Sequence, residues 1–82
     1  MKNKTERIAL SLCREGERLT IAGLSGSGAF RTRLIEMGFT KGTVVEIVRY
    51  APLRDPMELV VRNFHVSLRV EEAARILVTR PD

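Results

Sequence analysis

The sequence contains few of the residue types on which catalytic and metal sites depend. Among its 82 residues there is one cysteine, Cys13, one histidine, His65, and no tryptophan. A single cysteine cannot form an internal disulfide, and structural zinc sites need several cysteine or histidine ligands. This cysteine usage fits a reducing compartment, so we expect a cytoplasmic protein. Cys13 and His65 are also the only nucleophile and base of a catalytic kind, and nothing in their spacing brings them together, so we expect no enzymatic activity.

Long apolar runs are missing as well. No stretch approaches the ~20 apolar residues that a membrane-spanning helix requires. The lysine-rich start of the chain is followed by an apolar stretch, Ile8 to Cys13, that is too short for a signal peptide and is interrupted by Ser11. We therefore expect residues 1–7 to form a flexible tail, and any association with a membrane to come through a partner protein.

A concentrated run of one charge is the third absence. The formal net charge is +4, from 14 basic and 10 acidic residues, and no three basic residues are consecutive. Nucleic-acid-binding proteins usually gather basic charge on one face or in one run, so nucleic acid is not among the expected partners. A small barrel that binds nucleic acid, with Tyr50 stacking beside Arg49 and Arg62, remains the alternative.

Alternating apolar residues and β-branched residues predict a mostly β protein of about five short strands. We expect strands at residues 18–22, 43–50, 57–62, 64–70 and 76–78, and a short strand or turn edge at residues 8–12. The alternation in the fourth strand predicts that Phe64, Val66 and Leu68 share a buried face. A flat sheet of this size would leave two exposed edges. We therefore predict a small, partly open, SH3-like barrel over residues 8–80.

One helix is well marked, over residues 29–37. Three apolar residues recur at helical spacing on one of its faces: Phe30, Leu34 and Met37. Ser27 is a suitable N-cap, and Gly38 suits the position after the helix because glycine adopts positive φ without strain. Phe39 is expected to pack back on Leu34, as often happens at this kind of helix end.

Four local motifs occur in order between residues 10 and 78. They are Leu12-x-x-x-Gly16, the helix end and glycine turn RLIEMGFTKG at 33–42, the loop APLRDP at 51–56, and the closing segment at 67–73. Together they resemble the FeoA family, whose corresponding loop reads Ala-Pro-Leu-Gly-Asp-Pro. Arg54 stands where that loop commonly has glycine, so a positive φ there would strain the chain.

The resemblance implies an SH3-like fold, a cytoplasmic location and association with FeoB, a membrane ferrous-iron transporter with a cytosolic GTPase domain. It identifies the chain as an accessory or regulatory protein of ferrous iron uptake that acts by protein–protein binding. It does not indicate whether the chain activates, inhibits or scaffolds the transporter. The oligomeric state is also open, although the exposed edge of such a barrel can pair with another copy.

The proline-bounded loop and one flank of the helix are the candidate partner-binding surface. A rigid loop needs little ordering on binding, and arginine is favoured at interfaces. The residues in this prediction are Arg31, Arg33, Pro52, Leu53, Arg54, Asp55 and Met57.

His65 is the weak candidate for a metal ligand. It lies on the polar face of its strand, where a lone histidine is usually only solvated. With Cys13 and an acid such as Glu71 or Glu72 it could bind Fe(II) or another transition metal weakly, although no spacing demands such a site. We expect that no cofactor is required.

Overall fold

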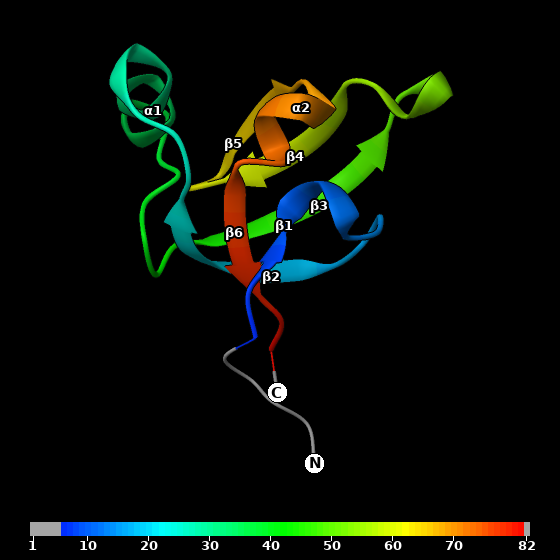
Figure 1. Ribbon diagram of the computed structural model, residues 1–82. Coiled ribbons are helices and arrows are strands. Elements are labelled where there is room, and N and C mark those ends of the chain that lie inside the picture. Colours follow the sequence, from blue (N-terminus) through cyan, green and yellow to red (C-terminus); the bar gives the residue numbers. More distant parts are fainter. Residues whose placement is uncertain (1–5, 82) are drawn as a thin grey trace.

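The computed structural model describes residues 6–81, which fold into one antiparallel sheet with two short helices (Figure 1). The strands are β1 (Ile8–Ala9), β2 (Arg18–Leu24), β3 (Val44–Tyr50), β4 (Met57–Val61), β5 (Phe64–Leu68) and β6 (Ile76–Thr79). The helices are α1 (Gly28–Glu36) and α2 (Val70–Ala73), and 3₁₀ turns occur at η1 (Leu10–Leu12) and η2 (Pro52–Arg54). Residues 8–12, expected as a short strand or turn edge, form a two-residue strand followed by a 3₁₀ turn.

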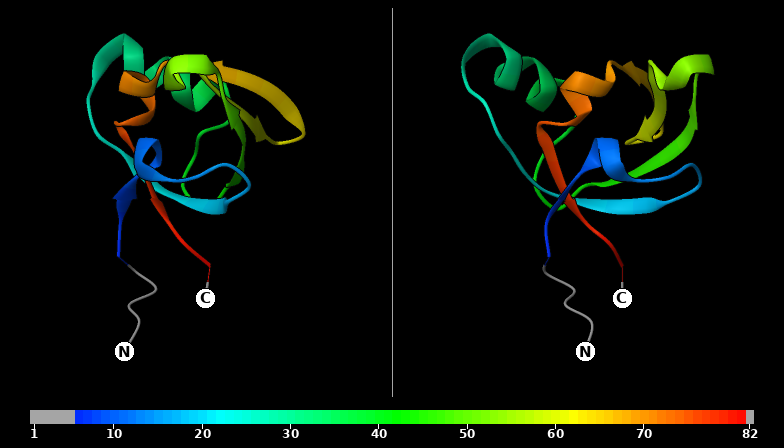
Figure 2. Two further views of the ribbon diagram at one scale, coloured as in Figure 1. Left: turned by 90° about the vertical axis from the view of Figure 1, so that its right-hand side faces the viewer. Right: turned by 45° about the vertical axis from the view of Figure 1, so that its right-hand side comes forward.

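The sheet has the order β1-β6-β2-β3-β4-β5 and curls around the core (Figure 2). Register shifts between Ile21 and Gly23 in β2, and between Ile47 and Arg49 in β3, mark bulges that help the strands bend. The prediction of a small, mostly β, partly open barrel with one main helix is confirmed. In Figure 1, α1, α2 and η2 lie at one end of the molecule, opposite the start of β1 and the end of β6.

The core is aliphatic, as the absence of tryptophan predicts. Phe39 is its only fully buried aromatic side chain among residues 6–81, and the other buried side chains are mostly leucine, isoleucine and valine. Leu34 of α1 and Ala73 of α2 close the core from the helical end. Each fully buried large side chain contributes about 1.5–3 kcal/mol through removal from water.

The C-terminal end of α1 forms the predicted glycine-terminated motif. The amide of Phe39 donates to the carbonyl of Leu34 and that of Gly38 donates to Ile35, both at 3.0 Å. Gly38 has φ +108, which a side chain would strain. At the other end Ser27 occupies the N-cap position, but its side chain makes no capping hydrogen bond. The N-cap position of Ser27 was therefore predicted correctly, but the hydrogen bond expected from a capping side chain is absent.

A two-residue reversal joins β4 to β5. Arg62 and Asn63 have φ of +52 and +69, the left-handed conformation that tight hairpins require. The burial expected along β5 is only partly observed, because Leu68 is buried and Val66 is half-buried while Phe64 is 70% exposed. The prediction of Phe64 as a core residue is wrong, since it lies beside the reversal at the end of an edge strand.

Candidate functional site

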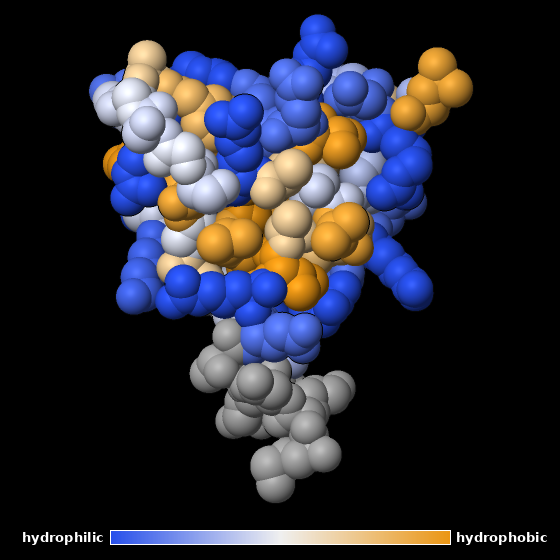
Figure 3. Space-filling view, in the orientation of Figure 1, coloured by the Kyte–Doolittle hydropathy of each residue, from blue (hydrophilic) through white to orange (hydrophobic). Residues whose placement is uncertain are grey.

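The loop that contains η2 holds an apolar side chain out in solvent. Leu53 is 98% exposed, and the apolar tip at the upper right of Figure 3 lies where Figure 1 places this loop. Leu53 and Arg54 have φ of +69 and +68, which costs of order 1–3 kcal/mol for residues with a side chain. The loop is closed by backbone hydrogen bonds from Arg54 to Ala51 at 2.8 Å and from Ala51 to Pro56 at 2.9 Å. These hydrogen bonds therefore hold Leu53 in its exposed position although its backbone conformation is strained.

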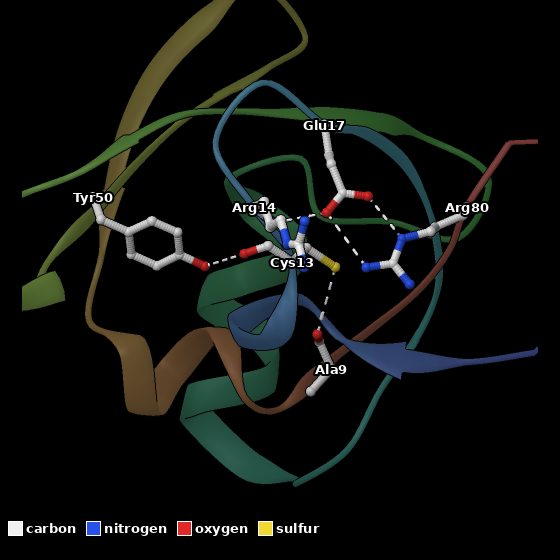
Figure 4. Close-up of polar contacts among 6 residues, drawn as sticks. All are labelled: Ala9, Cys13, Arg14, Glu17, Tyr50 and Arg80. Carbon is white, nitrogen blue, oxygen red and sulfur yellow. Dashed lines mark hydrogen bonds and ion pairs between the residues drawn. The ribbon is translucent and has the colours of Figure 1, made fainter.

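Tyr50, directly before the η2 loop, connects this loop to the segment around Ser11 and Cys13. Its hydroxyl donates to the carbonyls of Cys13 at 2.5 Å (Figure 4) and Ser11 at 3.3 Å, and its amide donates to the Glu15 carboxylate at 2.8 Å. The guanidinium of Arg54 lies over its ring, 4.2 Å from the centroid. Burial raises the pKa of Tyr50 above its ordinary value, which already lies well above neutral pH, so the phenol remains a hydrogen-bond donor.

A shallow hollow of about 510 Å³ adjoins the loop. Its lining combines charged, aromatic and apolar side chains: Arg14, Glu15, Tyr50, Ala51, Leu53 and Arg54. A mixture of an exposed apolar anchor, an aromatic ring and arginine is typical of protein-binding surfaces. The sequence prediction included Leu53 and Arg54 and missed the other four residues of this lining. Of these four, Tyr50 and Ala51 had an available signal, because they lie at the start of the proline-bounded loop.

Helix α2 links the two groups of predicted partner residues. The Asp55 carboxylate accepts a hydrogen bond from the Val70 amide at 3.1 Å, which fixes the loop to the start of α2. The Glu72 carboxylate pairs with Arg33 of α1 and accepts from the Arg69 amide at 3.0 Å. In Figure 1, α1 and η2 lie on opposite sides of α2, so α2 separates the helix flank from the loop.

Two other predicted partner residues, Arg31 and Met57, differ in exposure. Arg31 is exposed and donates to the Leu24 carbonyl at 3.1 Å, which ties α1 to the end of β2. Met57 is fully buried, opposite Leu68 in the β4–β5 ladder. Its inclusion in a surface is corrected, because β4 directs this side chain into the core.

The structure does not assemble the predicted metal ligands. Cys13 is buried, its Sγ donates to the Ala9 carbonyl at 3.7 Å (Figure 4), and burial raises the pKa of the thiol. His65 is exposed on β5. Among residues 6–81 no three His, Cys, Asp or Glu side chains gather where they could hold a metal ion. Metal binding by His65 stays a prediction.

The residues of the alternative nucleic-acid surface each make contacts within the fold. Arg49 pairs with Glu58 at 3.0 Å, and Arg62 donates to the Thr40 hydroxyl at 3.2 Å. One face of the Tyr50 ring is covered by the Arg54 guanidinium. Each group is therefore engaged within the fold.

An ion pair closes the opposite end of the barrel (Figure 4). Arg80 donates to both oxygens of the Glu17 carboxylate, at 2.7 and 3.4 Å, and the Arg14 amide donates to the same group at 2.7 Å. The hydrogen bond from Arg80 is the main cause that lowers the pKa of Glu17. This contact joins the residue after β6 to the turn before β2.

The length and composition of a helix determine whether it can cross a membrane. Within residues 6–81, neither α1 nor α2 is long and apolar enough to cross a membrane.

Comparison with known proteins gives a consistent result. The FeoA domain model matches residues 8–80. A Porphyromonas gingivalis protein named Fe(2+) transport protein A/Fe(2+) transporter FeoB fusion protein is 44% identical over 71 residues, which are 87% of this chain and 8% of that protein.

Solved structures agree. An NMR structure of a FeoA-like protein from Clostridium acetobutylicum superposes with a TM-score of 0.86 and 32% identity, covering 93% of this chain and 88% of that one. Zinc-complexed FeoA from Stenotrophomonas maltophilia, described as a procaryotic SH3 domain protein, gives a TM-score of 0.74 and 29% identity, covering 84% and 86%. The family model, the fused relative and these structures together show that the chain belongs to the FeoA family.

Proposed function

We propose that this chain is an accessory protein of ferrous iron uptake that binds the cytosolic part of a FeoB-type transporter and catalyses no reaction itself. The fused P. gingivalis relative supports this, because fusion keeps two units together that act together. The observation that carries the proposal is the strained, hydrogen-bonded loop that exposes 98% of Leu53.

The loop fits a binding role for physical reasons. Its backbone is fixed before binding, so little conformational entropy is lost when a partner covers it. Leu53 supplies an apolar anchor, and Arg54 beside it supplies a charge whose stem lies on Tyr50. A partner pocket that accepts Leu53 in one conformation and not in another would be biased toward the first.

A modest affinity is sufficient for this mechanism. Covalent linkage through a short flexible linker gives two units an effective concentration in the millimolar range, so the fused arrangement tolerates a weak contact. The S. maltophilia FeoA is described as a candidate activating factor of ferrous iron transport. By analogy we propose that contact through the loop promotes transport rather than only localising the chain.

The test is an affinity measurement with the purified cytosolic domain of the cognate transporter. Leu53→Ser and Arg54→Glu are expected to weaken binding at least tenfold, because the first removes the anchor and the second reverses its neighbouring charge. Val44→Ser is the matched control, since Val44 is 46% exposed and lies on β3 away from η2. Unchanged affinity in both loop variants would reject the loop as the docking site.

A further inference from the structure

A second hollow, of about 730 Å³, adjoins the one beside the η2 loop. It is lined by the turn between η1 and β2 and by the residue after β6: Leu12, Arg14, Glu15, Gly16, Glu17 and Arg80. Arg14 and Glu15 line both hollows. The two hollows therefore form one continuous surface, and Figure 1 places this turn and the η2 loop on the same side of the molecule.

Each end of this surface carries an exposed apolar side chain. Leu53 is 98% exposed and lines only the first hollow, while Leu12 is 72% exposed and lines only the second. The shared residues Arg14 and Glu15 lie between them. Exposed apolar surface rimmed by polar residues commonly marks an interaction site. The Leu12–Leu53 surface, formed by the linings of the two hollows, thus offers two apolar anchors with charged residues between them.

Hydrogen bonds fix both parts of this surface within the fold. The Gly16 amide donates to the Ile47 carbonyl at 2.7 Å, and the Ile47 amide donates to the Glu17 carbonyl at 3.0 Å. The Glu15 carboxylate accepts from the Tyr50 amide at 2.8 Å, which joins the turn to the start of the η2 loop. A surface that is held in place before binding loses little conformational entropy when a partner covers it.

The charges on the surface favour an acidic partner. Both carboxylates, of Glu15 and Glu17, accept hydrogen bonds from groups of the fold, and Arg80 forms an ion pair with Glu17. Arg14 and Arg54 are exposed, and neither forms an ion pair with another side chain of residues 6–81. The charges left for a partner are therefore two guanidinium groups, one at the junction of the hollows and one beside Leu53.

We propose that the Leu12–Leu53 surface binds an acidic segment of the partner, in which apolar side chains flank a carboxylate. The apolar side chains cover Leu12 and Leu53, and the carboxylate pairs with Arg14 between them through charge-assisted hydrogen bonds. This inference rests on the proposed function, since the partner is the cytosolic part of the transporter. It extends the contact from the η2 loop to the turn before β2.

The first test measures the affinity of the full chain for the purified cytosolic domain of the cognate transporter. Leu12→Ser removes the second anchor and should weaken binding by about tenfold, as loss of an anchoring side chain at an interface commonly does. Phe64→Ser is the matched control, because Phe64 is 70% exposed and lines a separate groove, the β5 groove, between the end of α1 and the β4–β5 hairpin. It should bind as the wild type does.

The second test concerns the charge at the junction. Arg14→Gln should weaken binding by about threefold to tenfold at low salt and by less at high salt, because salt screens the attraction. Arg14→Lys keeps the charge and should bind nearly as the wild type does. Lys41→Gln is the control for net charge, since Lys41 is exposed and lines neither hollow. The hydrogen bond from residue 14 to Glu17 comes from the backbone amide, so each substitution at this position retains its donor.

The outcomes separate this inference from the proposed function. Wild-type affinity in Leu12→Ser and Arg14→Gln, together with weakened binding in Leu53→Ser, would overturn the inference and leave the η2 loop alone as the docking site. Equal losses in Phe64→Ser and Lys41→Gln would also overturn it, because the effects would not be specific to this surface. A wild-type chain that does not bind the domain at any salt concentration would reject both the inference and the proposed function.

Discussion

Arg54 shows how one residue can be kept where glycine would be less strained. Its φ of +68 lies in the left-handed region, at the position where the loop of this family commonly has glycine. The Arg54 guanidinium lies on the Tyr50 ring, and a contact of this type contributes about 0.5–1 kcal/mol at exposed sites. The contact therefore offsets part of the strain at Arg54.

Replacement of Arg54 by glycine separates stability from binding. Glycine relieves about 1–2 kcal/mol of left-handed strain but loses the ring contact and gains freedom in the unfolded chain. We expect the free energy of unfolding of Arg54→Gly to stay within about 1 kcal/mol of the wild type in urea denaturation. Its affinity for the transporter domain should nevertheless fall. A large loss of stability would show that Arg54 is chiefly structural.

Gly38 is the residue at which a side chain is least tolerated. Its φ is +108, and an added Cβ would lie 3.0 Å from Cδ of Arg62. We expect Gly38→Ala to lower the free energy of unfolding by about 1–2 kcal/mol. Gly23→Ala is the control, because no heavy atom lies within 4 Å of its added Cβ and its φ is not positive. Equal stability of the two variants would contradict the role assigned to the helix end.

The sequence predicts which face of a strand a side chain lies on better than it predicts how exposed that side chain is. The alternation in β5 correctly places Phe64 on the same face as Leu68, yet Phe64 is exposed because nothing in the described chain covers that end of the edge strand. Met57 follows the proline-bounded loop and was expected at the surface, yet β4 turns it inward. Exposure depends on tertiary neighbours, which no local pattern contains.

At the scale of elements, local chemistry predicted more than long-range pairing did. The end of α1 depends on residues adjacent in sequence, and it was predicted. The short strand β1 is defined by its pairing with β6, through Ile8–Val78 and Ala9–Leu77. Because these partners are far apart in sequence, the local pattern could not predict the pairing. The role of α2 as a bridge between α1 and the loop likewise depends on Arg33 and Asp55, which lie far from it in sequence.

The Glu17–Arg80 contact predicts a pH dependence of stability. The pKa of Glu17 is lowered in the folded chain, so the contact stabilises above the ordinary glutamate pKa of about 4.3 and is lost as pH falls through the lower folded value. We expect Glu17→Gln to reduce the stability difference between neutral pH and pH ~3, by no more than about 1 kcal/mol because the pair is partly exposed.

A double-mutant cycle measures this contact directly. Glu17→Gln, Arg80→Gln and the double variant should show a coupling energy at neutral pH that disappears at low pH in thermal or urea denaturation. Coupling that is absent at neutral pH would contradict the assigned pair.

At the scale of the whole molecule, three regions have different surroundings. The η2 loop exposes Leu53 at the helical end, the β5 edge and its groove lie beside the end of α1, and the Glu17–Arg80 pair joins the ends of the barrel strands away from the helices.

The measurement that tests the central claim most directly is a residue-resolved NMR titration of the chain with the cytosolic domain of its transporter at near-physiological salt. The proposed function predicts shifts concentrated on Tyr50 and Pro52–Asp55, with smaller shifts in α2 and Arg33 because Asp55 and Glu72 connect them to the loop. Shifts confined to the β5 groove, or no shifts at all, would contradict the loop as the binding surface.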